Sequence, residues 1–150
     1  MASGIDPNAL RAAREEAGLT QHELARLVGA AGGERISRWE LGTSSPRPDF
    51  LVRLAKALDI PTLRLIQIDG EVPDLRALRL QAGLTAPKLA MAVKVAVPTY
   101  YAWEQGRWAR LPAPESLEAL ARACGVAVDA VVAAFRESQR QRQRRGDPSA

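Results

Sequence analysis

The chain has 150 residues, of which 47% are hydrophobic and 25% charged, a balance that indicates a folded globular protein and excludes a disordered one. Its single cysteine, Cys124, has no partner for a disulfide within the chain. One cysteine and one histidine cannot supply the three or four protein ligands of a zinc site. We therefore expect neither a disulfide framework nor a metal or other cofactor.

The ends and the charge distribution give further limits. Residues 1–7 lack the charged and apolar regions of a signal peptide, and no stretch reaches the roughly 18 apolar residues of a membrane span. We expect no membrane attachment and a cytoplasmic, nucleoid-associated protein of a bacterial cell. The net charge is +4, and the last fifteen residues carry five basic and two acidic side chains. Most of the excess charge therefore lies in the tail, and basicity alone is weak evidence for nucleic-acid binding.

An internal repeat organises the chain. Residues 10–25 align with residues 75–90 at an offset of 65, with ten identities in sixteen positions, and the match continues beyond them. A period this long exceeds that of solenoid repeats, so each copy is predicted to be a small domain. Turn residues cluster at 69–73. We therefore predict one domain over 1–69, a second over 70–136 and a basic C-terminal tail over 137–150.

Each copy is predicted to contain five short helices and no strand, which makes the fold class all-α. In the first copy, helical spacing of apolar residues begins at Leu10, and Gly18 is a plausible stop. The second helix of each copy is expected to begin at an N-cap threonine, and the third to end at a Trp-Glu pair. The fourth is expected to begin at a proline, which suits the first turn of a helix. The fifth helix of each copy is expected at about 62–66 and 128–136.

These elements carry a family resemblance. The run LTQHELARLVG at 19–29, the run ISRWELG at 36–42 and the helix that begins at Pro48 resemble the Cro/CI (XRE)-type helix-turn-helix family. The resemblance covers nearly all of residues 10–135 and implies two tandem lambda-repressor-like domains that bind double-stranded DNA. The second copy keeps the scaffold residues but has Ala86 in place of glutamine, Lys94 in place of the turn glycine and two tyrosines in place of Ile-Ser.

The resemblance implies which residues of the first copy contact DNA. Gln21, at the start of the second helix, faces phosphate. The base-facing positions fall on Gly32, Gly33, Glu34 and Arg38, and Arg38 is the main candidate because arginine can bond a guanine edge through two donors. Glu34 can accept from cytosine or pair with Arg38 four residues along the helix. The remaining candidates for contact with DNA are Arg35, Ser37 and Arg47.

The corresponding face of the second copy is nearly apolar, since Ala96, Val97, Pro98 and Ala102 stand there. This copy is better suited to holding phosphate or to contacting protein than to reading bases. The polar candidates are two hydroxyls on the third helix and two arginines in the loop after it, namely Thr99, Tyr101, Arg107 and Arg110.

Two charged pairs recur at matching positions of the copies. Arg14 and Glu40 correspond to Arg79 and Glu104. In the family that the chain resembles, such a pair bridges the first and third helices. We therefore expect both pairs to be structural.

The favoured function is sequence-specific binding of double-stranded DNA by a transcriptional regulator whose first domain reads bases in the major groove. Two linked domains can cover two half-sites, or the second can pair with another chain in a homodimer. The alternative is an antitoxin-like interaction module that binds a partner protein through Tyr100, Tyr101 and Trp108. No nucleophile has a histidine partner and no Gly-rich phosphate loop is present, so an enzyme is not expected.

The arginines of the tail leave two interpretations open. Arg136, Arg140, Arg142, Arg144 and Arg145 are expected to extend the last helix before it frays at Gly146. They either add phosphate contacts that weaken as salt rises or form a solvated helix end.

Overall fold

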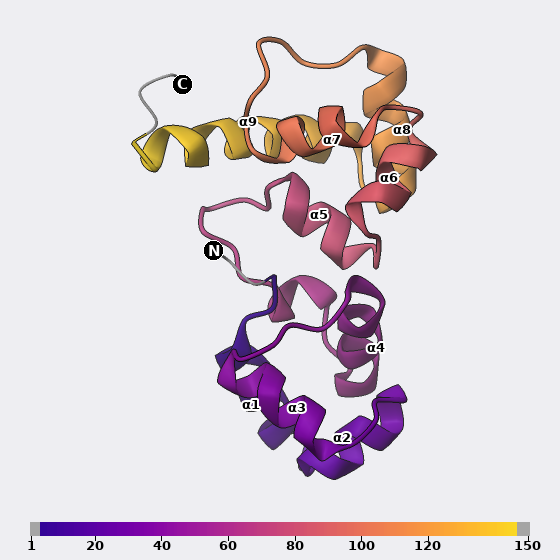
Figure 1. Cartoon of the computed structure of the whole chain (residues 1–150), viewed down its shortest axis with the longest axis vertical. Coiled ribbons are helices and arrows are strands. Elements are labelled where there is room, and N and C mark those ends of the chain that lie inside the picture. Colours follow the sequence, from indigo (N-terminus) through magenta and orange to yellow (C-terminus); the bar gives the residue numbers. More distant parts are fainter. Residues whose placement is uncertain (1–3, 147–150) are drawn as a thin grey trace. The chain divides into compact units, whose positions relative to one another are not determined.

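The computed structural model describes residues 4–146 and divides the chain into two compact units, one up to Gln67 and one from Ile68 onward (Figure 1). Within residues 4–146 the only regular elements are nine α-helices and one 3-10 helix, which confirms the all-α prediction. The first unit contains α1 (Pro7–Glu16), α2 (Gln21–Val28), α3 (Gly33–Leu41), α4 (Pro48–Leu58) and the 3-10 helix η1 (Thr62–Leu65).

Local signals set the helix boundaries of the first unit. The Asp6 side chain accepts bonds from the Asn8 and Ala9 amides, and Pro7 occupies the first turn, so α1 begins three residues before Leu10. Thr20 and Glu23 form a complete capping box at the start of α2. Gly29 and Gly42 end α2 and α3 in the left-handed conformation that glycine adopts without a Cβ penalty.

The core of the first unit collects one apolar face from each helix. Fully buried side chains come from α1, α2, α3 and α4, and the rings of Trp39 and Phe50 lie 5.7 Å apart. The two ends of the unit are joined, since the Asp6 amide donates to the Leu65 carbonyl at 2.7 Å and the Gln67 amide donates to the Gly4 carbonyl at 2.9 Å. The first unit is therefore closed around its own core.

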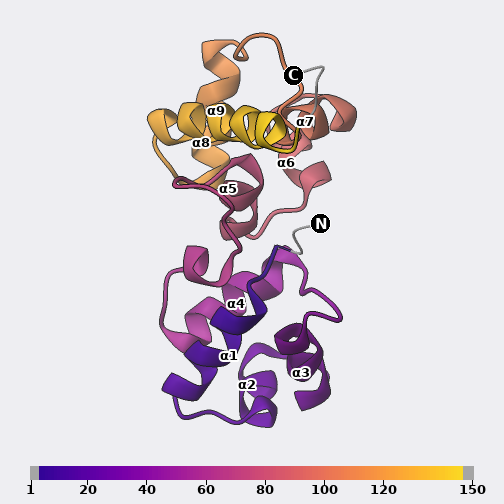
Figure 2. The same cartoon turned by 90° about the vertical axis from the view of Figure 1, so that its left-hand side faces the viewer.

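The second unit repeats this order with a longer last helix. It contains α5 (Leu75–Gln81), α6 (Ala86–Ala92), α7 (Val97–Glu104), α8 (Pro114–Cys124) and α9 (Val128–Arg144) (Figure 2). The 17-residue α9 packs against α5, α7 and α8. Phe135 on α9 contacts two tryptophan rings edge to face, Trp103 at 5.4 Å and Trp108 at 5.7 Å between ring centroids.

Helix α9 continues without a break past residue 136, the predicted end of the second domain, to Arg144. Glu137, Ser138 and Gln141 are buried, and they follow Ala134 at the spacing of one helix face. The Ser138 hydroxyl donates to the Ala134 carbonyl at 3.0 Å and accepts from the Leu75 amide at 3.4 Å. The residues just beyond 136 therefore pack within the second unit.

Candidate nucleic-acid interface

The α2–α3 pair of the first unit meets at a close contact made by glycine. A Cβ atom on Gly33 would lie 3.1 Å from the backbone nitrogen of His22, closer than nearly all such contacts. Gly32, just before it, is the N-cap of α3 and has an extended φ of 172°, without a side-chain cap. Gly33 therefore lets the start of α3 approach the start of α2, and a side chain at 33 would require the two helices to shift slightly apart.

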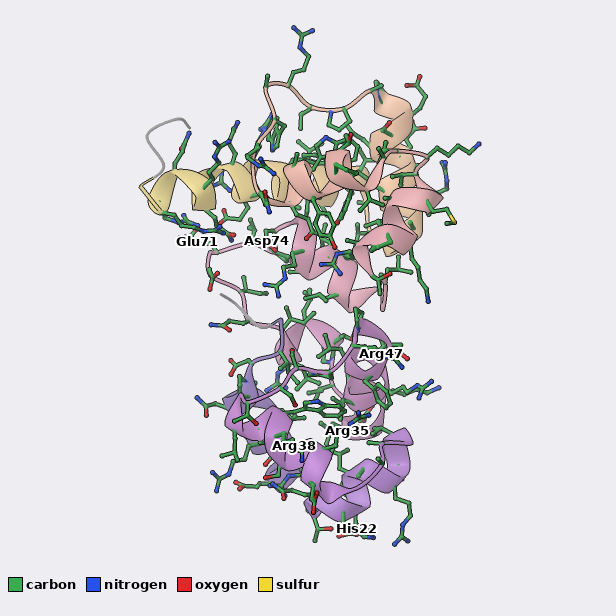
Figure 3. All side chains as sticks on the ribbon, in the orientation of Figure 1. His22, Arg35, Arg38, Arg47, Glu71 and Asp74 are labelled. Carbon is green, nitrogen blue, oxygen red and sulfur yellow. The ribbon has the colours of Figure 1, made fainter. Side chains whose placement is uncertain are left out.

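Helix α3 divides into an inward and an outward face. Ile36 is 0% exposed and Trp39 only 3%, so these two side chains anchor the helix in the core. Glu34 is exposed and Ser37 is half-buried. Arg35 and Arg38 are exposed as well (Figure 3). No ion pair joins Glu34 to Arg38, and Arg38 has no acidic partner among residues 4–146. The positive charge of Arg38 is therefore uncompensated by the part of the chain that the structure describes.

Gln21, the first residue of α2, donates its side-chain amide to Glu40 on α3 at 3.1 Å. Glu40 also accepts two bonds from Arg14, at 2.6 Å from Nε and 3.0 Å from Nη2. Arg14 donates a third bond to the Leu19 carbonyl at 2.8 Å. The hydrogen bond to Glu40 raises the pKa of Arg14, so the guanidinium stays protonated. Gln21 thus braces α3 from the end of α2 where the sequence placed a phosphate contact.

Arg47 lies outside the α2–α3 pair. It is the N-cap of α4, and its side chain is 77% exposed (Figure 3). Its Nε lies 3.9 Å from an Asp49 carboxylate oxygen, an ion pair that is weak at this exposure.

The second unit reproduces the buried pair of the first. Arg79 donates to both carboxylate oxygens of Glu104, and its Nη1 donates to the Leu84 carbonyl at 3.0 Å. Ala86 replaces Gln21 and cannot add a bond to the carboxylate. Close by, burial raises the pKa of the Cys124 thiol to about 11, so this cysteine stays protonated and unreactive.

The outward face of α7 differs from that of α3. Thr99 is exposed and Tyr101 is 43% exposed, but the charged residues of α3 have no counterpart there. Met91 at the end of α6 is 79% exposed. Arg107 and Arg110, in the loop after α7, are exposed as well. The polar groups available on this face are therefore hydroxyls on the helix and guanidinium groups beyond its end.

One of the three residues proposed to bind a partner protein, Tyr100, lies inside the second unit, so that part of the prediction is wrong. Tyr100 is 0% exposed, occupies the same core position as Ile36, and its hydroxyl has no hydrogen-bond partner among the described residues. Burial raises the pKa of Tyr100. Trp108 packs on Phe135 with its indole nitrogen buried. Trp108 is half-buried, and Tyr101 is exposed.

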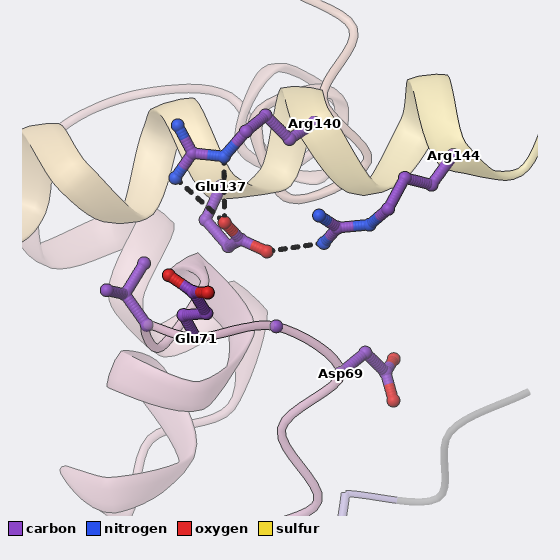
Figure 4. Close-up of a pocket in the computed structure, with 7 residues that line it drawn as sticks. Asp69, Glu71, Glu137, Arg140 and Arg144 are labelled. Carbon is purple, nitrogen blue, oxygen red and sulfur yellow. Dashed lines mark hydrogen bonds and ion pairs between the residues drawn. The ribbon is translucent and has the colours of Figure 1, made fainter.

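Sequence reasoning missed a charged cluster beside the segment that enters the second unit. The buried Glu137 carboxylate accepts bonds from Arg144 at 2.6 Å and Arg140 at 2.8 Å, beside residues 69–72 (Figure 4). A Cβ on Gly70 would lie 2.0 Å from a Glu137 oxygen, so only glycine fits there without displacement. Burial raises the pKa of Glu137, but the two arginines outweigh it and the net shift is downward. Periodicity along α9, which places Glu137 on the face of Ala134, was the available signal.

Other kinds of site find no support in the described part of the chain. Among residues 4–146, no group of histidine, cysteine and acidic side chains is arranged to hold a metal ion. No helix formed by those residues is both long and apolar enough to cross a membrane.

The fold and the paired helices define a DNA-binding protein with two helix-turn-helix domains. Residues 10–65 match a family model described as helix-turn-helix, and residues 74–135 match a second described as helix-turn-helix domain. The chain therefore belongs to the helix-turn-helix family, its first domain being of the Cro/CI type. Proteins of this family generally regulate through DNA binding and are not enzymes. Searches among curated proteins and among solved structures found no match.

Proposed function

We propose that the protein is a sequence-specific transcriptional regulator whose first domain reads bases in the major groove through α3. The observation that carries this proposal is the uncompensated, exposed guanidinium of Arg38 on a helix that Ile36 and Trp39 hold in the core. An arginine in that position can donate two bonds to a guanine edge, the commonest specific contact in the major groove. Arg35 and Glu34 flank it on the exposed face of α3.

The start of α2 is proposed to contact the phosphate backbone. The N-terminal amides of a helix and its positive dipole end favour an anion. Gln21 is held there by its bond to Glu40, so its position relative to α3 is set before DNA binds. Phosphate contacts from α2 orient the domain, whereas base contacts from α3 provide the sequence preference. Gly32, Gly33, Ser37 and Arg47 are proposed as further contacts of the same surface.

The second domain is proposed to contribute contacts that do not depend on sequence. Its α7 offers Thr99 and Tyr101 as hydroxyl donors, and Arg107 and Arg110 follow the helix. These groups suit phosphate oxygens better than base edges. One chain is therefore expected to select an asymmetric DNA site, with a defined base sequence in one half and no sequence requirement in the other.

The test is selection of bound duplexes from a random pool, followed by binding measurements on the selected site and on unrelated duplex. Arg38→Ala should lower affinity for the selected site by about 1–3 kcal/mol and reduce the preference over unrelated duplex. Arg64→Ala removes an exposed arginine from η1, which packs on α1 and α4, and serves as the matched control. If both variants lose affinity equally for all duplexes, Arg38 does not read bases.

The exposed apolar side chains of the second domain support a second candidate function, binding of another protein or of a second copy. Met91 and Tyr101, on α6 and α7, are 79% and 43% exposed. Methionine and tyrosine are among the residue types enriched at protein interfaces. Sedimentation of the wild type and of Met91→Lys tests the self-association arm. A concentration-dependent dimer that the substitution abolishes supports it, and a monomer at all concentrations contradicts it.

A further inference from the structure

The end of α9 and the loop after α7 bring basic side chains together in the second unit. Gln105, Arg107, Arg142 and Arg145 line one shallow, open hollow of about 240 Å³. We propose that this hollow, called here the α7–α9 basic surface, binds the phosphate backbone of duplex DNA. The proposal rests on the DNA-binding function proposed above and adds a backbone contact from outside the helix-turn-helix pair.

Close packing holds α9 in place beside the end of α7. Gly106, which ends α7, is buried against the backbone of α9, and a Cβ there would lie 2.5 Å from the Ser138 carbonyl oxygen. The Gln139 side chain donates to the Trp108 carbonyl at 3.3 Å. Phe135 packs against Trp103 and Trp108. The arginines of the last turns of α9 are thus presented from an anchored helix.

The arginines near the end of α9 and in the loop after α7 differ in whether they have an acidic partner. Arg140 and Arg144 both bond the buried carboxylate of Glu137, which compensates one of their two charges. Arg145, and Arg107 across the hollow, are exposed and have no acidic partner among residues 4–146. Arg107 and Arg145 both line the hollow, and an anion placed between two like charges reduces their mutual repulsion.

The chemistry and shape of the surface favour a phosphodiester chain. Guanidinium groups bond phosphate oxygens through two parallel donors, and the Gln105 amide can add a third. The hollow is open rather than enclosed, so a continuous strand can lie along it. It adjoins the C-terminal end of α7, which is the second helix of its helix-turn-helix pair.

If Arg145 only stabilises the helix, the expected effects of its loss are different. Arginines in the last turn of a helix also stabilise it by interacting with the negative end of the helix dipole. In that case, loss of Arg145 would lower the stability of the second unit and leave the salt dependence of DNA binding unchanged. The two roles are therefore separable by measurement.

The experiment compares two double variants of the full chain that remove equal charge. R107Q/R145Q neutralises the α7–α9 basic surface, and R122Q/R136Q neutralises two exposed arginines of α8 and α9 outside it. Affinity for a short random-sequence duplex is measured over a series of chloride concentrations. Each lost phosphate contact lowers the slope of log affinity against log salt by about 0.9, so R107Q/R145Q should lose about 1.8 and the control almost nothing.

Each outcome has one meaning. Equal slopes for the two variants contradict phosphate binding at the α7–α9 basic surface, because the removed charges would then act only at long range. A wild type that binds no duplex at the lowest salt overturns the proposed DNA-binding function itself. Inorganic phosphate is added to the wild-type complex at ionic strength matched with chloride. A hollow that binds backbone phosphate predicts that inorganic phosphate displaces the duplex more strongly than chloride does, and equal displacement by the two anions contradicts it.

Discussion

Lys94 adopts in the second domain the left-handed backbone conformation that Gly29 adopts in the first, with φ of 60° and 75°. The two residues stand 65 positions apart, at the end of α6 and of α2. A side chain in this conformation crowds the following carbonyl oxygen, at a cost of roughly 1–2 kcal/mol, whereas glycine adopts it freely. The second domain therefore keeps the turn of the first but retains backbone strain at this position.

Lys94→Gly should stabilise the second unit. Glycine relieves the strain but loses more freedom on folding, so we expect a net gain of about 0.5–1 kcal/mol. Hydrogen exchange of amides in α6 and α8 reports the stability of this unit separately from the first. The matched change in the first unit, Gly29→Ala, should have the opposite effect. It should destabilise that unit by a similar amount and should not slow the exchange of its amides. A lower stability of the Lys94→Gly variant would contradict the prediction.

Gly106→Ala should cost more stability than Gly42→Ala, although the two glycines have φ of 74° and 76°. Both variants lose about 1 kcal/mol from the left-handed conformation. At Gly106 the added Cβ also lies 2.5 Å from the Ser138 carbonyl oxygen, whereas at Gly42 its nearest neighbour is Pro7 Cγ at 3.6 Å. Displacement of α9 should add about 1–3 kcal/mol, measured by denaturant unfolding. Equal losses of stability in the two variants would show that α9 moves away from the added Cβ at no cost in free energy.

Glu104→Ala should destabilise the second unit by about 3–5 kcal/mol, because it leaves the Arg79 guanidinium buried without a counter-ion. The side chains of the pair are 10% and 7% exposed. Glu118, exposed on α8, supplies the control, and Glu118→Ala should change stability by less than about 0.5 kcal/mol. Thermal unfolding distinguishes the two variants, and similar melting temperatures would mean that the buried pair contributes little.

The acid sensitivity of the second unit should depend on Glu137. Its pKa in the folded chain lies below the ordinary value of 4.5, so its ionised form contributes stability that is present above pH 4.5 and is lost as the pH falls through the folded pKa. Glu137→Gln should remove this part of the pH dependence, measured as unfolding free energy between pH 3 and pH 6. The exposed residue Glu115 provides the comparison, since Glu115→Gln should keep the wild-type slope. An unchanged slope in Glu137→Gln would contradict the role of the cluster.

Much of the fold followed from local signals in the sequence. The repeat placed the elements of both domains, and proline, threonine and glycine marked helix ends that the structure confirms at Pro48, Thr85 and Gly42. The paired arginines and glutamates were also found by alignment of the copies. These features could be predicted because caps and helical spacing act within a few residues.

The surface of the second domain could not be predicted in the same way. The two tyrosines are adjacent in sequence, yet Tyr100 is buried and Tyr101 exposed, and Trp108 turns inward onto Phe135. Which aromatic side chain reaches solvent depends on the register of α7 and on the path of the following loop. Sequence reasoning had grouped all three as surface residues.

By itself the sequence determined an all-α chain of two related domains, because helix caps and apolar periodicity are local. Only the tertiary structure decided that α3 packs closely on α2 at Gly33, that Glu137 lies beside residues 69–72, and that α9 packs against Gly106. Each of these contacts joins residues that lie on different elements. Their formation depends on how whole helices pack, and no short stretch of sequence contains that information.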